Sequence, residues 1–242
     1  MKIVSLVPSI TETLFDFGLD KTEIIGRTKF CIHPKSSVKD IEIIGGTKNL
    51  NLEKIKKLNP DLVIANKEEN EKSQIENLQK SLNVWVTDIE NLEDNKTFLS
   101  ELGAMLNREN TAEKYIGKIA DIFDKSTIKE ELSVAYLIWK NPYMTVGSDT
   151  FIHEILTRLG LRNIFNSEKR YPEITVENMA TADYIFLSSE PYPFGNKHIT
   201  ELQTILPNSK IILVDGEAFS WYGTHLAKCE TYFQTLKKLL NR

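Results

Sequence analysis

The chain contains 242 residues, of which 41% are hydrophobic and 26% charged, a composition typical of a soluble globular protein. The formal net charge of −4 argues against the basic surface of nucleic-acid-binding proteins, so we expect no nucleic-acid partner. No apolar run approaches the ~18 residues that span a bilayer, so we expect no membrane-integral segment. Cys31 and Cys229 are too few and too far apart for a disulfide framework or a metal-ligand cluster.

Short β-branched segments alternate with helical patterns along the chain, which predicts an α/β fold with mainly parallel sheets. Residues 108–132 contain no proline and have hydrophobic residues at helical spacing. We therefore predict a linking helix over 107–132 between an amino-terminal lobe, 1–106, and a carboxyl-terminal lobe, 133–242. The first lobe should hold strands at 3–7, 24–28, 62–65 and 84–87 and helices at 10–17, 52–58, 73–81 and 92–106.

The first expected helix carries recognisable start and stop signals. Ser9-Ile10-Thr11-Glu12 has the spacing of a capping box, in which Ser9 and Glu12 bond each other's backbone amides. Gly18 is predicted to end the helix. The Pro8-Ser9 corner should then lie at the carboxyl end of the first strand, where open α/β sheets bind ligands.

The second half repeats the first in outline. The pattern E-x-L-x-x-x-G-L occurs at 12–19 and again at 154–161. Farther along, Asn51-Leu52-Glu53 precedes the strand at 62–65, and Thr175-Val176-Glu177 precedes the apolar run after Asp183. Two matches in the same order predict two similar α/β lobes. Two lobes joined by one helix would form a cleft, and clefts between domains are favoured ligand sites.

Several segments of the chain, in order, match one known family. The segments are IVSLVPSITE at 3–12, Gly45-Gly46, NLEKI at 51–55, LNPDLV at 58–63, Trp139, TVG at 145–147 and GLRN at 160–163. They resemble the helix-linked, class III substrate-binding proteins of ABC importers, whose members carry vitamin B12, haem and ferric siderophores. The resemblance covers nearly the whole chain and is closest to the cobalamin-binding branch.

This resemblance implies two Rossmann-like lobes with a ligand cleft between them, and a monomer that reversibly captures a corrinoid or a ferric chelate for ABC-type uptake. It implies no intrinsic cofactor. An alternative is a cytoplasmic carrier or sensor of such chelates without a transport role. As it stands, the chain runs from Met1-Lys2 directly into a strand without a secretory leader, which predicts a cytoplasmic location, or a periplasmic one if a leader was removed.

The family also implies a docking surface for an ABC permease. One glutamate on each lobe contacts permease arginines, and by motif position these are Glu53 and Glu177. Their equivalent places in the internal repeat support this assignment. The alternative is that each is a first-turn glutamate favoured by the helix dipole.

Aromatic and polar residues at loop positions are the candidates for ligand contact, because aromatic faces hold flat chelates by area and stacking. Phe219-Ser220-Trp221-Tyr222-Gly223 places three rings in a presumed loop, where exposure to water without a use is costly. We expect these rings to form a wall of the ligand site; the alternative is that they pack between the lobes. The predicted ligand-binding residues are Pro8, Ser9, Lys29, Phe30, Lys48, Trp139, Tyr143, Tyr171, Trp221, Tyr222 and His225, with Arg27 as a further cleft candidate.

Two departures from the B12 carriers bear on the ligand. Where those carriers present a tyrosine and a tryptophan on the first lobe, this chain has Lys29 and Lys48, which favours an anionic ligand. Cys31-Ile32-His33 offers a soft ligand and an imidazole, but two residues do not complete a metal site, so we expect no metal there. Trp85 lies inside a predicted strand and is expected in the core.

Catalytic motifs are absent from the sequence. It contains no G-x-G-x-x-G, no G-x-x-x-x-G-K-[ST], no G-x-S-x-G and no H-E-x-x-H. The Gly45-Gly46 turn is too short to cradle a phosphate. The sequence therefore predicts a binding protein and not an enzyme, with no catalytic residues.

Overall fold

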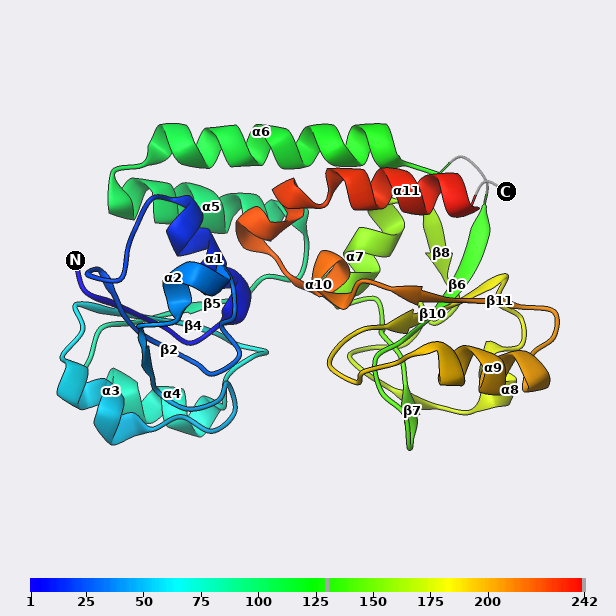
Figure 1. Cartoon of the computed structure of the whole chain (residues 1–242), viewed down its shortest axis with the longest axis horizontal. Coiled ribbons are helices and arrows are strands. Elements are labelled where there is room, and N and C mark those ends of the chain that lie inside the picture. Colours follow the sequence, from blue (N-terminus) through cyan, green and yellow to red (C-terminus); the bar gives the residue numbers. More distant parts are fainter. Residues whose placement is uncertain (129–130, 241–242) are drawn as a thin grey trace. The chain divides into compact units, whose positions relative to one another are not determined.

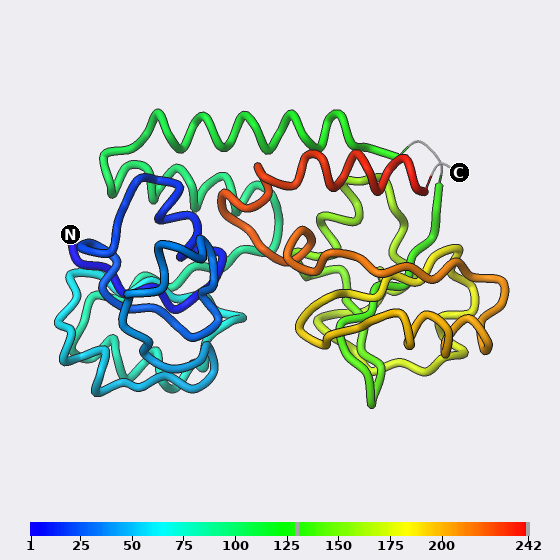
Figure 2. Tube along the Cα trace, viewed as in Figure 1, coloured from blue at the N-terminus to red at the C-terminus, as the bar shows by residue number. Residues whose placement is uncertain are grey.

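The computed structural model describes residues 1–128 and 131–240, which divide into two compact units. The first unit comprises Met1–Ile89, Glu93–Gly117 and Tyr222–Leu226, and the second comprises Glu90–Leu92, Lys118–Trp221 and the chain from Ala227 onward. A short segment near the carboxyl terminus therefore belongs to the amino-terminal unit. The tube in Figure 2 lets this return of the chain be followed by colour.

The first unit is built on a five-stranded, fully parallel sheet with the order β3-β2-β1-β4-β5. The strands are β1 (Ile3–Ser5), β2 (Ile24–Arg27), β3 (Glu42–Ile43), β4 (Leu62–Asn66) and β5 (Val84–Thr87). All residues of β1 and β4 are buried, because both strands are covered on two faces.

Helices cover both faces of this sheet. They are α1 (Pro8–Asp16), α2 (Lys35–Val38), α3 (Leu52–Leu58), α4 (Lys72–Gln79), α5 (Leu92–Leu106) and α6 (Glu109–Ser126), whose second half belongs to the other unit. Figure 1 shows α3 and α4 together on one face and α1 on the opposite face. This arrangement follows from right-handed crossovers, because the chain moves outward from β1 in one direction and returns past it in the other.

The second unit contains a four-stranded parallel sheet and a small antiparallel ribbon, β7 with β9. The sheet order is β11-β10-β6-β8. The strands are β6 (Leu132–Leu137), β7 (Tyr143–Met144), β8 (Leu161–Asn163), β9 (Glu173–Ile174), β10 (Tyr184–Ser188) and β11 (Lys210–Val214). The helices are α7 (Phe151–Arg158), α8 (Val176–Met179), α9 (Asn196–Ile205), α10 (Gly216–Ser220), the 3₁₀ helix η1 (Gly223–Lys228) and α11 (Glu230–Leu240).

The internal repeat read from the sequence is present in the two topologies. The order β2-β1-β4-β5 of the first unit corresponds to β8-β6-β10-β11 of the second, and all of these neighbours are parallel. In both copies of the E-x-L-x-x-x-G-L pattern, the first residues lie in a helix, α1 or α7, and the glycine that follows the helix has a positive φ. The α/β fold with two similar lobes and parallel sheets is confirmed.

Each unit has its own core. In the first, Ile3, Leu6, Ile10 and Leu14 are fully buried between the sheet and α1. In the second, Leu137, Met179, Ile185, Leu187 and Leu202 are fully buried in one cluster. The burial of whole strands accounts for their continuous apolar sequences, which made them recognisable.

Two sequence predictions about helix ends are wrong. The capping box at Ser9 does not form, because Pro8 is the first residue of α1 and Val7 is its N-cap, so Ser9 lies inside the first turn. The same early start ends β1 at Ser5 instead of Val7. The linking helix predicted over 107–132 is shorter, because α6 ends at Ser126 and β6 begins at Leu132; residues 129–130 lie outside the described part.

No helix of the described residues is long and apolar enough to cross a membrane.

The repeated helix ends give a test of backbone geometry. Gly18 and Gly160 both have positive φ, at 88° and 80°. A Cβ at Gly18 would meet nothing within 4 Å, whereas at Gly160 it would lie 2.4 Å from the carbonyl oxygen of Ile128. We expect Gly18→Ala to lower the free energy of unfolding by about 1 kcal/mol and Gly160→Ala by at least about 2 kcal/mol, measured by urea denaturation. Equal losses would mean that the left-handed conformation alone sets the cost.

Candidate functional site

The predicted ligand residues of the first unit lie at one edge of its sheet. Pro8 and Ser9 follow β1, Lys29 and Phe30 follow β2, and Lys48 follows β3. Because the strands are parallel, these loops all open at the carboxyl edge, which is where α/β sheets bind ligands. Phe30 is 50% exposed there, while Ser9 is buried.

The two lysines that favoured an anionic ligand are engaged within this unit. The Lys48 ammonium donates a hydrogen bond to the backbone carbonyl of Glu68. The Lys29 ammonium lies 4.9 Å from the centroid of the Phe30 ring, a cation–π arrangement. Both lysines remain exposed, so their charges stay at the edge, although each already has a partner.

The side chains of Arg27 and Cys31 are buried and hydrogen-bonded within the first unit. The Arg27 side chain is buried and donates through Nε to the carbonyl of Val38 at 2.8 Å. The Cys31 thiol is fully buried and accepts a hydrogen bond from the Thr11 hydroxyl at 3.0 Å. Burial raises the pKa of this thiol, which makes it unreactive. Within the described ranges, no group of three or more His, Cys, Asp or Glu residues is placed to hold a metal ion.

A shallow cavity of about 170 Å³ in the first unit lies between β5 and α5. Its lining includes Trp85 and Phe98, whose rings are 5.4 Å apart, and none of the residues predicted to bind ligand. Trp85 is half-buried, so the core position predicted for it is only partly reached.

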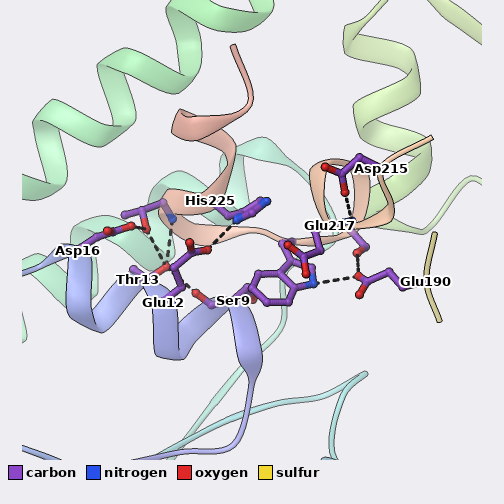
Figure 3. Close-up of polar contacts among 11 residues, drawn as sticks. Ser9, Glu12, Thr13, Asp16, Glu190, Asp215, Glu217 and His225 are labelled. Carbon is purple, nitrogen blue, oxygen red and sulfur yellow. Dashed lines mark hydrogen bonds and ion pairs between the residues drawn. The ribbon is translucent and has the colours of Figure 1, made fainter. Parts of the chain in front are cut away.

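Tyr222 and His225 belong to the segment that returns to the first unit. Tyr222 is 6% exposed and packs edge-on against Phe98, with ring centroids 6.3 Å apart. His225 lies in η1, just before the final helix, α11. Its Nδ1 is 2.7 Å from Oε2 of Glu12, and both side chains are nearly buried (Figure 3).

Further polar bonds fasten the same segment. The amide of Gly223 donates to Oδ1 of Asn95 at 2.6 Å, and the amide of Thr224 donates to the Thr13 hydroxyl at 3.1 Å. The Thr224 hydroxyl also donates to the Asp16 carboxylate. Glu12, Thr13 and Asp16 therefore use the polar side of α1 to hold residues more than 200 positions away in the sequence. No local pattern in the sequence indicates this pairing.

In the second unit, the predicted residues lie after β6, in or next to the β7–β9 ribbon, and at the end of α10. Trp139 follows β6, is 41% exposed, and meets Tyr192 edge-on at 5.6 Å. Tyr143 begins β7 and is half-buried, and burial raises its pKa. Tyr171 is half-buried beside Arg170, whose guanidinium is 5.6 Å from the ring centroid. The role of each in ligand binding stays a prediction.

Trp221 is oriented by an acidic side chain that the sequence did not single out. Its indole Nε1 donates to Oε1 of Glu190 at 2.9 Å, and Trp221 itself is only 8% exposed (Figure 3). Phe219, which the sequence placed in a loop, lies in α10 and is fully buried against Tyr136 and Phe186. The loop reading is wrong for Phe219, because Asp215 caps a short helix that turns this ring into the core, whereas Trp221 and Tyr222 lie between α10 and η1.

The two predicted docking glutamates occupy matching positions. Glu53 follows the N-cap Asn51 in the first turn of α3, and its side chain is 87% exposed. Glu177 follows the N-cap Thr175 in the first turn of α8 and is also exposed. A hydrogen bond from the Thr175 side chain lowers the pKa of Glu177, so it is ionised at neutral pH.

Comparison with known proteins decides the family. The model of the family described as periplasmic binding protein matches residues 3–204. The chain belongs to this family. Its members are substrate-binding proteins, and the partners implied by the family are a small-molecule ligand and an ABC permease.

Individual relatives differ in what their names say they bind. The vitamin B12-binding protein of Vibrio campbellii is 25% identical over 201 residues, which cover 81% of this chain and 72% of that protein. An uncharacterized ABC transporter substrate-binding lipoprotein of Bacillus subtilis, YvrC, is 30% identical over 73% of this chain, which spans 59% of the lipoprotein. The crystal structure of the periplasmic haem-binding protein HutB of Vibrio cholerae aligns with a TM-score of 0.82 at 18% identity, covering 100% of this chain and 99% of that one.

The nearly buried contact between Glu12 and His225 yields a prediction about stability. Removing one partner leaves the other polar group buried without its main contact, so we expect His225→Ala to lower the free energy of unfolding by about 3 kcal/mol. In a double-mutant cycle with Glu12→Gln, the double variant should lose clearly less than the sum of the single losses, measured by urea denaturation. Additive losses would show that the two side chains do not stabilise each other.

Proposed function

We propose that this protein reversibly binds a metal chelate of the corrinoid type and delivers it to an ABC permease for uptake. The observation that carries the proposal is an exposed aromatic ring at the carboxyl edge of each sheet, Phe30 in the first unit and Trp139 in the second. Exposed rings at ligand-binding edges provide the flat apolar area that a macrocyclic chelate needs. The position of the ligand between the two lobes stays a prediction from the sequence.

The names of two relatives favour a transport role over that of a cytoplasmic carrier or sensor. YvrC is named as an ABC transporter lipoprotein, and the Vibrio campbellii relative is named for vitamin B12. We therefore propose that the protein acts on the outer side of the cytoplasmic membrane, which is the second of the two locations that the sequence left open. The proposal assigns it no catalysis, only binding and release.

The exposed glutamates support docking to a permease. Glu53 and Glu177 have the same place in the repeat and the same first-turn position after an N-cap. Such carboxylates are available for pairing with arginine, which binds a carboxylate through two parallel hydrogen bonds. The helix dipole alone would explain their presence in a first turn, but it does not require them to be solvent-exposed.

Ligand binding is tested by titration. We expect cobalamin or cobinamide to quench tryptophan fluorescence saturably and to show a shifted absorbance spectrum in the presence of the protein, with free tryptophan correcting for the inner-filter effect. Trp139→Ala should weaken binding about tenfold, because the exposed indole loses its contact area with the ligand. Trp85→Phe, which alters a ring away from the predicted residues, should leave the dissociation constant unchanged.

Haemin and a panel of ferric siderophores belong in the same titration. Saturable binding of one of these alone would replace the corrinoid by that chelate and keep the transport role. If no chelate binds, the metal-chelate function is excluded.

Docking is tested by charge reversal. We expect Glu53→Lys and Glu177→Lys each to reduce uptake of radiolabelled cobalamin about tenfold, in cells that express the chain together with an ABC permease and take up cobalamin with the wild-type chain. The affinity for cobalamin should not change, because both side chains are solvent-exposed and neither is a predicted ligand contact. Glu76→Lys is the matched control, since Glu76 is also an exposed helix glutamate with a lysine neighbour. Equal uptake by all three variants would refute the docking assignment.

A further inference from the structure

The loop after β10 holds a carboxyl group, that of Glu190, whose contact with Trp221 uses only one of its two oxygens. Glu190 lies two residues beyond the end of β10. The Ser188 hydroxyl donates to the Glu190 backbone carbonyl at 2.6 Å, which fixes the turn. On the side chain, Oε1 accepts hydrogen bonds from Nε1 of Trp221 and from the Ser220 hydroxyl, both at 2.9 Å (Figure 3). The carboxyl group is therefore held in one orientation by two donors from the α10 end.

The second oxygen of this carboxyl group is not satisfied by the protein. Oε2 of Glu190 has no hydrogen-bond partner in the described part of the chain, and no lysine, arginine or histidine there forms an ion pair with Glu190. Burial is the main cause that raises the pKa of Glu190, and the nearby carboxylates of Glu217 and Asp215 act in the same direction. Glu190 is half-buried, and its Oε2 is not among the fully enclosed unpaired atoms of the described residues, so a donor from outside the protein can reach it.

The loop that carries this carboxyl group contacts the exposed ring of this unit. Tyr192, two residues after Glu190, contacts Trp139 with ring centroids 5.6 Å apart. Trp139 and the Glu190 loop thus follow neighbouring parallel strands, β6 and β10, at the same carboxyl edge. A ligand that stacks on Trp139 would be within the reach of groups on the Glu190 loop.

We propose that Glu190 accepts a hydrogen bond from an N–H group of the ligand and thereby selects chelates with carboxamide side chains over chelates with carboxylate side chains. This inference rests on the proposed function. A carboxamide N–H complements the unpaired oxygen, whereas a carboxylate would face Glu190, Asp215 and Glu217 as a like charge. Lys29 and Lys48, which pointed to an anionic ligand in the sequence, already have partners in the first unit.

The test uses two corrinoids with the same corrin ring. Cobinamide carries amides, one of them bearing an aminopropanol group, where cobyrinic acid carries carboxylates, so the pair compares side-chain chemistry on one macrocycle. We expect the wild-type protein to bind cobinamide at least about tenfold more tightly than cobyrinic acid, measured by absorbance titration and equilibrium dialysis. This comparison requires no variant and stands even if a substitution disturbs folding.

Glu190→Gln removes the charge and keeps an oxygen for Trp221 and Ser220. We expect it to reduce the preference for cobinamide about tenfold, mainly by tightening the binding of cobyrinic acid. Glu131→Gln is the matched control, because Glu131 immediately precedes β6 at the opposite, amino-terminal edge of the same sheet and its side chain is 85% exposed. This control should keep the wild-type preference, and circular dichroism melts should show both variants folded.

The outcomes separate the two proposals. If the wild-type protein binds both corrinoids equally, or prefers cobyrinic acid, the selectivity inference is overturned while chelate binding stands. The same holds if the preference is present but Glu190→Gln and Glu131→Gln behave alike. If the wild-type protein binds neither corrinoid and no other chelate, the proposed function fails and the inference about Glu190 fails with it.

Discussion

Parallel strand pairing is the constraint on which the rest of this structure depends. Once β1 pairs with β2 and β4, and β6 with β8 and β10, every loop that follows a strand must open at the same edge of its sheet. Right-handed crossovers then place the helices on both faces and leave the edge uncovered for side chains such as Phe30 and Trp139. The candidate residues therefore gather within each unit, although they are far apart in the sequence.

Much of this architecture could be predicted from local patterns. Whole-strand burial makes a strand such as β4 a continuous apolar run, and the helices α3 and α5 have the bounds that helical spacing predicted. Errors arose where two local signals compete. Pro8 and Ser9 both favour a helix start, and the proline determined where α1 begins.

The contacts that orient the candidate residues could not be predicted, because they join distant parts of the chain. Nothing local in Glu12 indicates that it meets His225, 213 positions later, and Glu190 is 31 positions from Trp221. The Phe219 ring looked exposed because its short helix, α10, depends on the Asp215 cap and on a core position that the sequence does not show. The positions of these loop residues could therefore be known only from the tertiary structure, whereas most strands and helices could be predicted from local sequence patterns.

The return of Tyr222–Leu226 to the first unit has a consequence for biosynthesis. The Thr13 hydroxyl can accept the hydrogen bond from the Thr224 amide only after 211 more residues have been synthesised. During that time the polar side of α1 has no segment to hold, so the nascent amino-terminal unit exposes Glu12, Thr13 and Asp16 to water. The two lobes look like successive copies of one fold, yet the first is completed only after the strands of the second have been synthesised. A fragment cut after α6 would lack the residues that complete its own fold.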